Sequence, residues 1–196
     1  MASPHKLVII DRDGTLNIDS DDYIKSVDEW QPYPNALHAI ARLNHAGWHV
    51  VVATNQSGLG RGLFDMATLN AMHEKMHRNL AAAGARVDAV FFCPHPPEDA
   101  CACRKPASGL FEQIKERYGR SNLDGVPNVG DSLRDLQAGS ALGCESHLVL
   151  TGKGEAFRGR PLSDQFPADT RVHEDLLAFA DWFLARELIK SGAHAA

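Results

Sequence analysis

The chain has 196 residues, of which 44% are hydrophobic and 23% are charged, as is usual for one globular domain with a sizeable core. Its 20 basic and 25 acidic residues give a net charge of −5 without a long block of either sign, which argues against a surface that binds nucleic acid. Met1 to His5 show no sign of a signal peptide and no apolar run is long enough to span a membrane, so we expect a cytoplasmic protein.

Short apolar runs alternate along the chain with segments of helical periodicity. The runs predict buried strands at residues 6–10, 49–53, 89–93, 126–129 and 147–150. Apolar residues three or four positions apart predict helices at 34–47, 65–84, 109–118, 133–142 and 174–188. This alternation predicts an α/β fold, doubly wound and Rossmann-like, in which helices cover both faces of a parallel sheet. We expect a single domain over residues 1–196, in which the stretch 152–170, rich in Gly, Pro and charge, is a loop.

Ligands of such sheets bind beyond the carboxyl ends of the strands, so the residues after each apolar run are the first candidates for chemistry. The first run leads into Asp11-Arg-Asp-Gly-Thr-Leu16, where a turn at Gly14 can bring two carboxylates together. Carboxylates two residues apart suit both a hard divalent cation and phosphoryl transfer. The alternative is a solvated turn, because Asp-Gly is common in loops.

Polar side chains also follow the second and third strands. The run Thr54-Asn-Gln-Ser57 offers hydroxyl and amide groups that can donate hydrogen bonds to phosphate oxygens, although small polar residues after a strand are often caps. In Cys103-Arg-Lys-Pro106, the residue before the proline is Lys105, whose positive charge can face the same crevice. The alternative for a lone lysine is a position facing water.

The fourth strand supplies a second acidic pair, in Val129-Gly-Asp-Ser-Leu-Arg-Asp135. Asp131 and Asp135 lie four residues apart and share a helical face if a helix begins near Ser132. The alternative for Asp131 alone is a helix N-cap. The four strand ends therefore supply, in chain order, an acid pair, a hydroxyl, a cation and an acid.

This order resembles the four motifs of the haloacid dehalogenase (HAD) superfamily of phosphatases, from Asp11 to Asp135. The resemblance implies a HAD fold and magnesium-dependent hydrolysis of a phosphate monoester, in which Asp11 attacks phosphorus and forms an aspartyl-phosphate. It also implies that Mg²⁺ is held by Asp11, Asp131 and the backbone carbonyl of Asp13. Many relatives carry a basic residue after the Gly-Asp pair, where this chain has Ser132.

The same resemblance gives roles to the remaining motif residues. Asp13 protonates the leaving alkoxide and later takes a proton from water, a role that needs a raised pKa, for which a neighbouring carboxylate is a cause. Thr54 and the backbone N–H of Asn55 hold the phosphoryl oxygens. Lys105 neutralises charge in the transition state, and Asp135 orients Lys105 or a metal-bound water.

A segment that we call the cysteine loop, residues 93–103, offers a second metal site. Its three thiols and one imidazole belong to Cys93, His95, Cys101 and Cys103. This set suits a tetrahedral zinc ion with no position left for water, so the predicted zinc is structural and fixes the segment that carries Arg104 and Lys105. The alternative is a set of free buried thiols. Cys144, which stands apart, is predicted to be a core thiol.

Within the superfamily, these motifs together with the cysteine loop look like those of two families, the D-glycero-D-manno-heptose 1,7-bisphosphate 7-phosphatases and the histidinol-phosphate phosphatases. The run from Thr54 to Gly62, which includes Arg61, favours the heptose family. Arg61 and Arg104 can then hold the phosphate that is not hydrolysed through bidentate hydrogen bonds. The short spacing between His95 and Cys101 favours the histidinol-phosphate family instead.

We therefore expect an open site without a large cap domain, with the cysteine loop at its rim. The expected substrate-binding residues are Asn55, Gln56, Ser57, Arg61 and Arg104. The expected ligand is a small phosphorylated sugar of a heptose route that feeds cell-envelope lipopolysaccharide, and the expected assembly is a monomer. A function of another class is a zinc-stabilised module that binds a cation without turnover, which predicts no magnesium-dependent release of phosphate.

Overall fold

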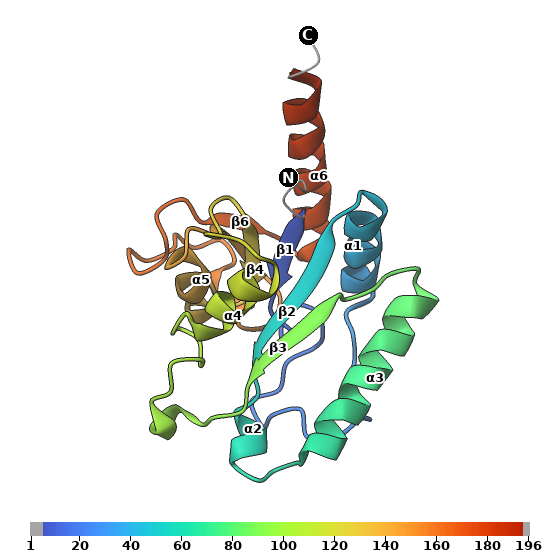
Figure 1. Cartoon of the computed structure of the whole chain (residues 1–196), viewed down its shortest axis with the longest axis vertical. Coiled ribbons are helices and arrows are strands. Elements are labelled where there is room, and N and C mark those ends of the chain that lie inside the picture. The colour runs from blue at the N-terminus through green and yellow to red at the C-terminus, as the bar shows by residue number, and fades with distance from the viewer. Residues whose placement is uncertain (1–5, 194–196) are drawn as a thin grey trace.

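A parallel sheet with helices on both faces forms the body of the protein, as a computed structural model of residues 6–193 shows (Figure 1). The sequence expectation for Met1 to His5 lies outside these described residues. The sheet has the strand order β3-β2-β1-β4-β5-β6, and the strands are β1 (Leu7–Ile10), β2 (His49–Asn55), β3 (Ala89–Cys93), β4 (Pro127–Gly130), β5 (Glu145–Val149) and β6 (Arg171–His173). Every neighbouring pair is parallel. The predicted doubly wound fold is therefore confirmed.

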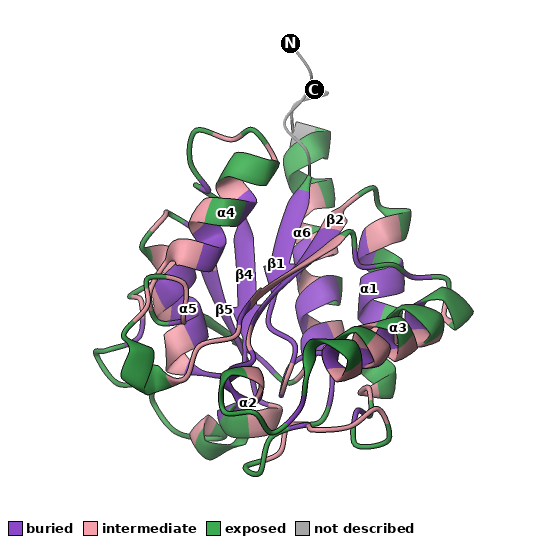
Figure 2. Ribbon diagram, turned by 60° about the horizontal axis from the view of Figure 1, so that its bottom comes forward, coloured by how far each residue is buried: buried purple, intermediate pink, exposed green. Residues whose placement is uncertain are grey.

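The helices divide between the two faces of the sheet. They are α1 (Pro34–His45), α2 (Ser57–Gly60), α3 (Met66–Ala82), α4 (Gly109–Arg117), α5 (Leu133–Ser140) and α6 (Leu176–Ala193), with short 3₁₀ segments η1 (Pro97–Asp99) and η2 (Gly152–Phe157). Val8 and Ile10 of β1 pack with α1, α3 and α6, whereas Leu7 and Ile9 pack with α4 on the other face. Figure 2 shows the central strands buried between these layers. Within residues 6–193 no helix is both long and apolar enough to cross a membrane.

Several local predictions are confirmed. Asp65 is the N-cap of α3 and accepts a hydrogen bond from the backbone N–H of Thr68 at 2.8 Å. Met72 and Met76 are fully buried in the core that α3 forms with the sheet, and Cys144 is buried beside α4. The burial of the two methionines follows from the helical spacing of apolar residues in α3, because such a stripe is buried against the sheet.

Other boundaries differ from the predictions. Strand β6 was not predicted, because Arg-Val-His is short and lacks an apolar run, and helix α6 continues five residues beyond the predicted end at 188. Helix α5 begins at Leu133 with Ser132 as its N-cap, so Asp131 precedes the helix instead of sharing its face with Asp135.

The loops that line the candidate site leave the carboxyl ends of the strands. Part of the loop after β1, which we call the flap (residues 18–31), is closed at its base by a 2.9 Å hydrogen bond from the Ile18 N–H to the Gln31 carbonyl.

Candidate active site

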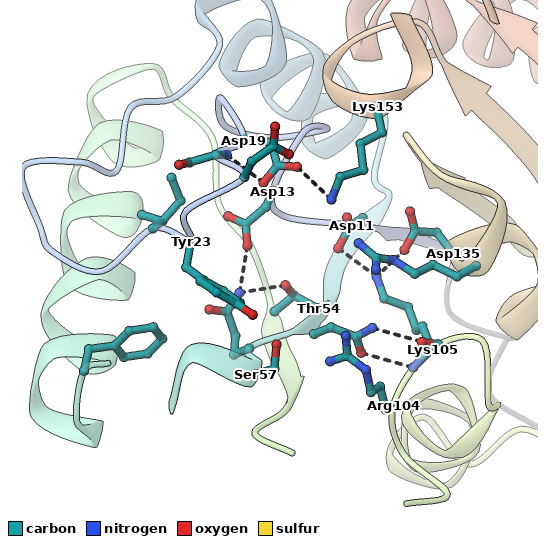
Figure 3. Close-up of a pocket in the computed structure, with 17 residues that line it drawn as sticks. Asp11, Asp13, Asp19, Tyr23, Thr54, Ser57, Arg104, Lys105, Asp135 and Lys153 are labelled. Carbon is teal, nitrogen blue, oxygen red and sulfur yellow. Dashed lines mark hydrogen bonds and ion pairs between the residues drawn. The ribbon is translucent and has the colours of Figure 1, made fainter. Parts of the chain in front are cut away.

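A cavity of about 200 Å³ opens where β1, β2 and β4 end, as the strand-end rule predicts (Figure 3). Side chains from the motif residues, the flap and the segments after the strands line it. They include Asp11, Asp13, Asp19, Tyr23, Thr54, Asn55, Gln56, Ser57, Phe64, Arg104, Lys105, Arg134, Asp135 and Lys153. Residues far apart in the sequence therefore meet around one opening.

Three carboxylates form what we call the acidic cluster: Asp11, Asp131 and Asp135. One oxygen from each lies within 4.8 Å of the others, and all three residues are buried. Burial and the repulsion from Asp135 raise the pKa of Asp11 to about 7, and burial with Asp135 and Asp11 raises the pKa of Asp131 to about 9. Such a set of crowded oxygens favours a bound hard cation.

Two glycines make room for the Asp131 carboxylate. Gly14 adopts a φ of +87°, and a Cβ there would lie 2.0 Å from Asp131 Oδ2. A Cβ at Gly152 would lie 2.3 Å from the same oxygen. The Lys153 backbone N–H donates to this oxygen at 2.8 Å. The motif glycine at 14 is therefore needed both for its backbone conformation and for the close approach of Asp131 at the end of β4.

Lys105 lies against the acidic cluster. Its ammonium group is 2.7 Å from Asp11 Oδ1 and 2.8 Å from Asp135 Oδ1, and it donates to the Ala53 carbonyl at 2.7 Å. Burial alone lowers the pKa of Lys105, but the two carboxylates outweigh it and raise that pKa. Asp135 is held in turn as the N3 member of a capping box with Ser132. Lys105 is therefore a fixed positive charge beside Asp11.

Asp13 lies apart from the acidic cluster. Arg12, which is fully buried, binds its carboxylate through two hydrogen bonds of 2.9 and 3.0 Å, and Asn17 and Gln56 donate to it at 2.9 and 2.8 Å. Burial raises the pKa of Asp13, but the charge of Arg12 and these hydrogen bonds prevail and lower it. The prediction that a neighbouring carboxylate raises this pKa is therefore wrong for the free protein, because the nearest charged group is a cation.

Of the side chains from Thr54 to Ser57, at the end of β2, some form hydrogen bonds within the protein and others face the cavity. Gln56 Nε2 donates to Thr54 Oγ1 at 2.9 Å as well as to Asp13. The side-chain amide of Asn55 donates to the Lys105 carbonyl at 3.0 Å and accepts from the Lys105 N–H at 3.1 Å. Ser57 lines the cavity at the start of α2. The amides of Asn55 and Gln56 therefore hold neighbouring residues in place.

The two arginines predicted to bind substrate occupy different positions. Arg61 lies outside the cavity lining and forms hydrogen bonds of 2.8 and 3.0 Å to the carboxylate of Glu98 in the cysteine loop. Only Nη2 is used in this ion pair, and the prediction of Arg61 as a phosphate ligand stays a prediction. Arg104 lines the cavity. Its pKa is lowered mainly by burial and further by the nearby charge of Arg134.

Sequence reasoning missed Asp19, Tyr23, Arg134 and Lys153, all of which line the cavity. Lys153 Nζ lies 3.3 Å from Asp19 Oδ2, which connects the segment after β5 to the flap. Applying the strand-end rule to the fifth strand would have identified Lys153. The length of the segment between β1 and α1 was the signal for the flap residues, because long loops in compact domains are often functional.

The cysteine loop brings its four predicted zinc ligands together. The sulfur–sulfur distances are 3.5 Å for Cys93 to Cys101, 3.5 Å for Cys101 to Cys103 and 3.0 Å for Cys103 to Cys93. His95 Nδ1 lies 3.6 and 3.3 Å from the sulfurs of Cys93 and Cys103. A tetrahedral zinc site with Zn–S bonds of about 2.3 Å has edges of about 3.8 Å, so the four ligand atoms fit such an ion after a small expansion.

This arrangement can support phosphoryl transfer, because a buried carboxylate beside a fixed cation faces hydroxyl and amide groups in one cavity. A family model described as polynucleotide kinase 3 phosphatase matches residues 6–138, and a HAD-hydrolase-like model matches residues 102–178.

Relatives named D-glycero-beta-D-manno-heptose-1,7-bisphosphate 7-phosphatase are similar over nearly their whole length. The protein from Bordetella bronchiseptica is 58% identical over 91% of this chain and 98% of its own, and that from Pseudomonas aeruginosa is 50% identical over 91% and 97%. The crystal structure of the D,D-heptose 1,7-bisphosphate phosphatase from B. bronchiseptica, complexed with magnesium and phosphate, matches with a TM-score of 0.87 and 56% identity over 92% of this chain and 99% of that one. The chain therefore belongs to the haloacid dehalogenase superfamily and, within it, to the family of the D-glycero-β-D-manno-heptose-1,7-bisphosphate 7-phosphatases.

Proposed function

We propose that this protein is a magnesium-dependent phosphatase that removes the 7-phosphate of D-glycero-D-manno-heptose 1,7-bisphosphate through an aspartyl-phosphate. The observation that carries the proposal is the position of Asp11, whose carboxylate lies in the cavity 2.7 Å from Lys105 and within the acidic cluster. The names of the relatives, at 58% and 50% identity, support the choice of substrate.

In the first step, an oxygen of Asp11 attacks phosphorus, and the bond from phosphorus to the C7 oxygen of the sugar breaks. The Thr54 hydroxyl and the Asn55 backbone N–H hold the phosphoryl oxygens. The charge of Lys105 offsets the negative charge that builds up in the transition state. Asp13 donates a proton to the leaving alkoxide, which departs as the sugar hydroxyl.

In the second step, Asp13 takes a proton from a water molecule, whose oxygen attacks phosphorus. The bond from phosphorus to Asp11 breaks, which releases inorganic phosphate and restores the carboxylate. The low pKa of Asp13 in the free protein suits this second step, because the group is then a carboxylate. For the first step, the negative charge of the bound phosphate raises the pKa of Asp13 and allows it to carry a proton.

The residues of the acidic cluster fit a magnesium ion. Within residues 6–193, no cationic side chain forms an ion pair with Asp131, although the carboxylate is buried. Asp11, Asp131 and the backbone carbonyl of Asp13 would hold Mg²⁺, which supplies charge neutralisation that lets an anionic nucleophile meet an anionic phosphate. Asp135 orients Lys105.

Arg104 and Arg134 are the groups that we assign to the 1-phosphate, in place of the pair Arg61 and Arg104. Both guanidinium groups line the cavity, and they are close enough for Arg134 to lower the pKa of Arg104. Two neighbouring cations at a cavity wall suit a dianion between them. Arg134 lies two positions after Ser132 and so restores a cation to the motif that lacks one there.

The cysteine loop holds a structural zinc ion in this proposal. Its three sulfurs and one imidazole nitrogen have the chemistry and mutual distances of a four-ligand site. The ion fixes the segment that continues into Arg104 and Lys105, so that these side chains need not be ordered by the substrate. A monomeric protein in the cytoplasm remains the expectation from the sequence, and gel filtration tests the assembly.

A comparison of substrates tests the proposal directly. Phosphate release is measured from heptose 1,7-bisphosphate and from histidinol phosphate, with magnesium or with excess EDTA. We expect a higher kcat/KM for the sugar bisphosphate and no turnover in EDTA. Preference for histidinol phosphate would replace the substrate with that of the alternative family. No magnesium-dependent release from either compound would favour a cation-binding module.

A further inference from the structure

Tyr23, in the flap, has a backbone conformation that is unusual for a large side chain. Its φ is +66°, and its N–H donates to the Ser20 carbonyl at 3.2 Å to close a turn. Glycine, which has no Cβ, adopts this region readily, and asparagine is found there several times more often than most other residues. An aromatic residue at such a position indicates that the side chain itself has a use, because strained backbone persists at binding and catalytic sites.

The Tyr23 side chain belongs to the wall of the active-site cavity. It points from the flap toward the labelled side chains of the strand ends (Figure 3). The flap also contributes Asp19, Ser20, Asp21 and Ile24 to the lining. Tyr23 and Ile24, with Phe64 from beyond α2, therefore supply apolar surface in a cavity whose other side chains are mostly charged or polar. Tyr23 is 36% exposed, which leaves part of its surface free for a ligand.

The hydroxyl of Tyr23 lies near two arginines of neighbouring loops. It acts on Arg61, whose pKa is raised chiefly by Glu98 and further by Tyr23, and it opposes the lowering of the Arg104 pKa by burial and by Arg134. The phenol therefore lies near both guanidinium groups. Arg61 is in turn bound to Glu98, so the ring lies near an arginine that the cysteine loop holds.

Resting on the proposed function, we propose that Tyr23 is a specificity-determining residue whose ring contacts the apolar C–H face of the sugar between its two phosphates. The cleaved phosphate lies at Asp11 and the second phosphate at Arg104, and the Tyr23 ring lies on the flap side of the same cavity. A sugar ring offers C–H groups on one face and hydroxyls around its edge, so an aromatic side chain selects it over a small acyclic phosphate.

The test compares Tyr23→Gly with wild type on two substrates, heptose 1,7-bisphosphate and acetyl phosphate, which lacks a sugar. Glycine accepts the positive φ, so the variant is expected to keep the thermal midpoint of wild type. We expect kcat/KM for the sugar bisphosphate to fall about tenfold, mainly through KM, and to fall at least about fivefold more than for acetyl phosphate. Tyr23→Phe separates the ring from its hydroxyl and should lose less than Tyr23→Gly.

Ile18→Ala is the matched control, because Ile18 is half exposed in the same flap and lies outside the active-site lining. An equal loss of kcat/KM on both substrates in Tyr23→Gly, or a similar loss in Ile18→Ala, would overturn the proposal for Tyr23. Wild-type protein that cleaves acetyl phosphate but not the heptose bisphosphate would instead overturn the proposed substrate. If Tyr23→Gly lowers the thermal midpoint, Tyr23→Asn, which also tolerates this φ, provides the same comparison.

Discussion

The acidic cluster and the cysteine loop both gather metal-ligating side chains beside the carboxyl ends of the strands, but they are assembled differently. The acidic cluster joins the end of β1 to the end of β4 and the first turn of α5. The cysteine loop takes all four ligands from residues 93–103. The first site therefore exists only once the sheet has formed, whereas the second depends on local spacing.

The two clusters also differ in how strongly burial and charge repulsion oppose their assembly. The acidic cluster places three buried carboxylates within 4.8 Å, and their burial and repulsion raise the pKa values of Asp11 and Asp131. The cysteine loop is half-buried at two of its thiols, Cys101 and Cys103. The fold must therefore hold the acidic cluster together against this repulsion. The difference teaches that the acidic cluster depends on the whole sheet for its assembly, whereas the cysteine loop depends on one segment of the chain.

Substituting the nucleophile should have the largest effect on activity. In Asp11→Asn, the amide keeps the shape of the side chain but cannot form an acyl phosphate, so we expect phosphate release to fall by at least about 10³-fold. The variant should stay folded, since one member of a crowded acidic set becomes neutral. Circular dichroism and a thermal midpoint no lower than wild type provide the control, and substantial turnover in this variant would rule out the covalent route.

Removing a zinc ligand from the cysteine loop should lower thermal stability clearly and lower kcat/KM less than substitution of the nucleophile does. In Cys101→Ser, loss of a thiolate ligand should abolish stoichiometric zinc, lower the thermal midpoint by about 5–10 °C and lower kcat/KM about tenfold, because the segment to Lys105 loses its anchor. Bound zinc is measured by elemental analysis. Cys144→Ser is the control, since that thiol is buried but is not one of the four clustered ligands, and its variant should keep the zinc. Full zinc content in Cys101→Ser would contradict the four-ligand site.

Arg104 and Arg134 come from the cysteine-loop side and the acidic-cluster side of the cavity. Substituting one of them tests whether the two sides bind the second phosphate together. Arg104 follows the cysteine loop, and Arg134 lies in α5 beside the acidic cluster. We expect Arg134→Ala to raise KM for the sugar bisphosphate about tenfold and to have little effect on a phosphate monoester without a second phosphate. Arg160→Ala, at an exposed arginine of the loop after η2, is the control. Equal effects on both substrates would remove Arg134 from the second-phosphate site.

Much of the fold could be predicted from the sequence because apolar periodicity reports burial directly. The strand predicted at 49–53 and observed at 49–55, the strand at 89–93 and the helix that contains Met72 and Met76 were found in this way. Strand β6 could not be found, because its three residues are held by pairing with β5 and not by an apolar run of their own. The ends of α5 and α6 depend on capping and packing, which spacing alone does not determine.

The candidate site was predictable where its residues directly follow strands. It was less predictable where a side chain has several possible hydrogen-bond partners. Spacing located all four side chains of the cysteine loop, and strand ends located Asp11 and Lys105. The sequence did not indicate that Arg12 turns inward to bind Asp13 or that Arg61 pairs with Glu98. The contact with Arg12 lowers the pKa of Asp13, which was expected to be raised. The contact between Arg61 and Glu98 depends on how two separate loops pack.

The smallest effect concerns the stability of metal-free protein. Between the ordinary aspartate pKa of 3.8 and the folded value of about 9 for Asp131, the folded state holds more protons than the unfolded state, so this group destabilises the fold as pH rises. In EDTA, Asp131→Asn should therefore be more stable than wild type, by about 1–2 kcal/mol near pH 8, with a smaller difference at pH 5. Magnesium should stabilise wild type and not the variant. Asp164→Asn, at an exposed loop aspartate, is the control, and the same gain in both variants would show that net charge, rather than crowding in the acidic cluster, causes the change.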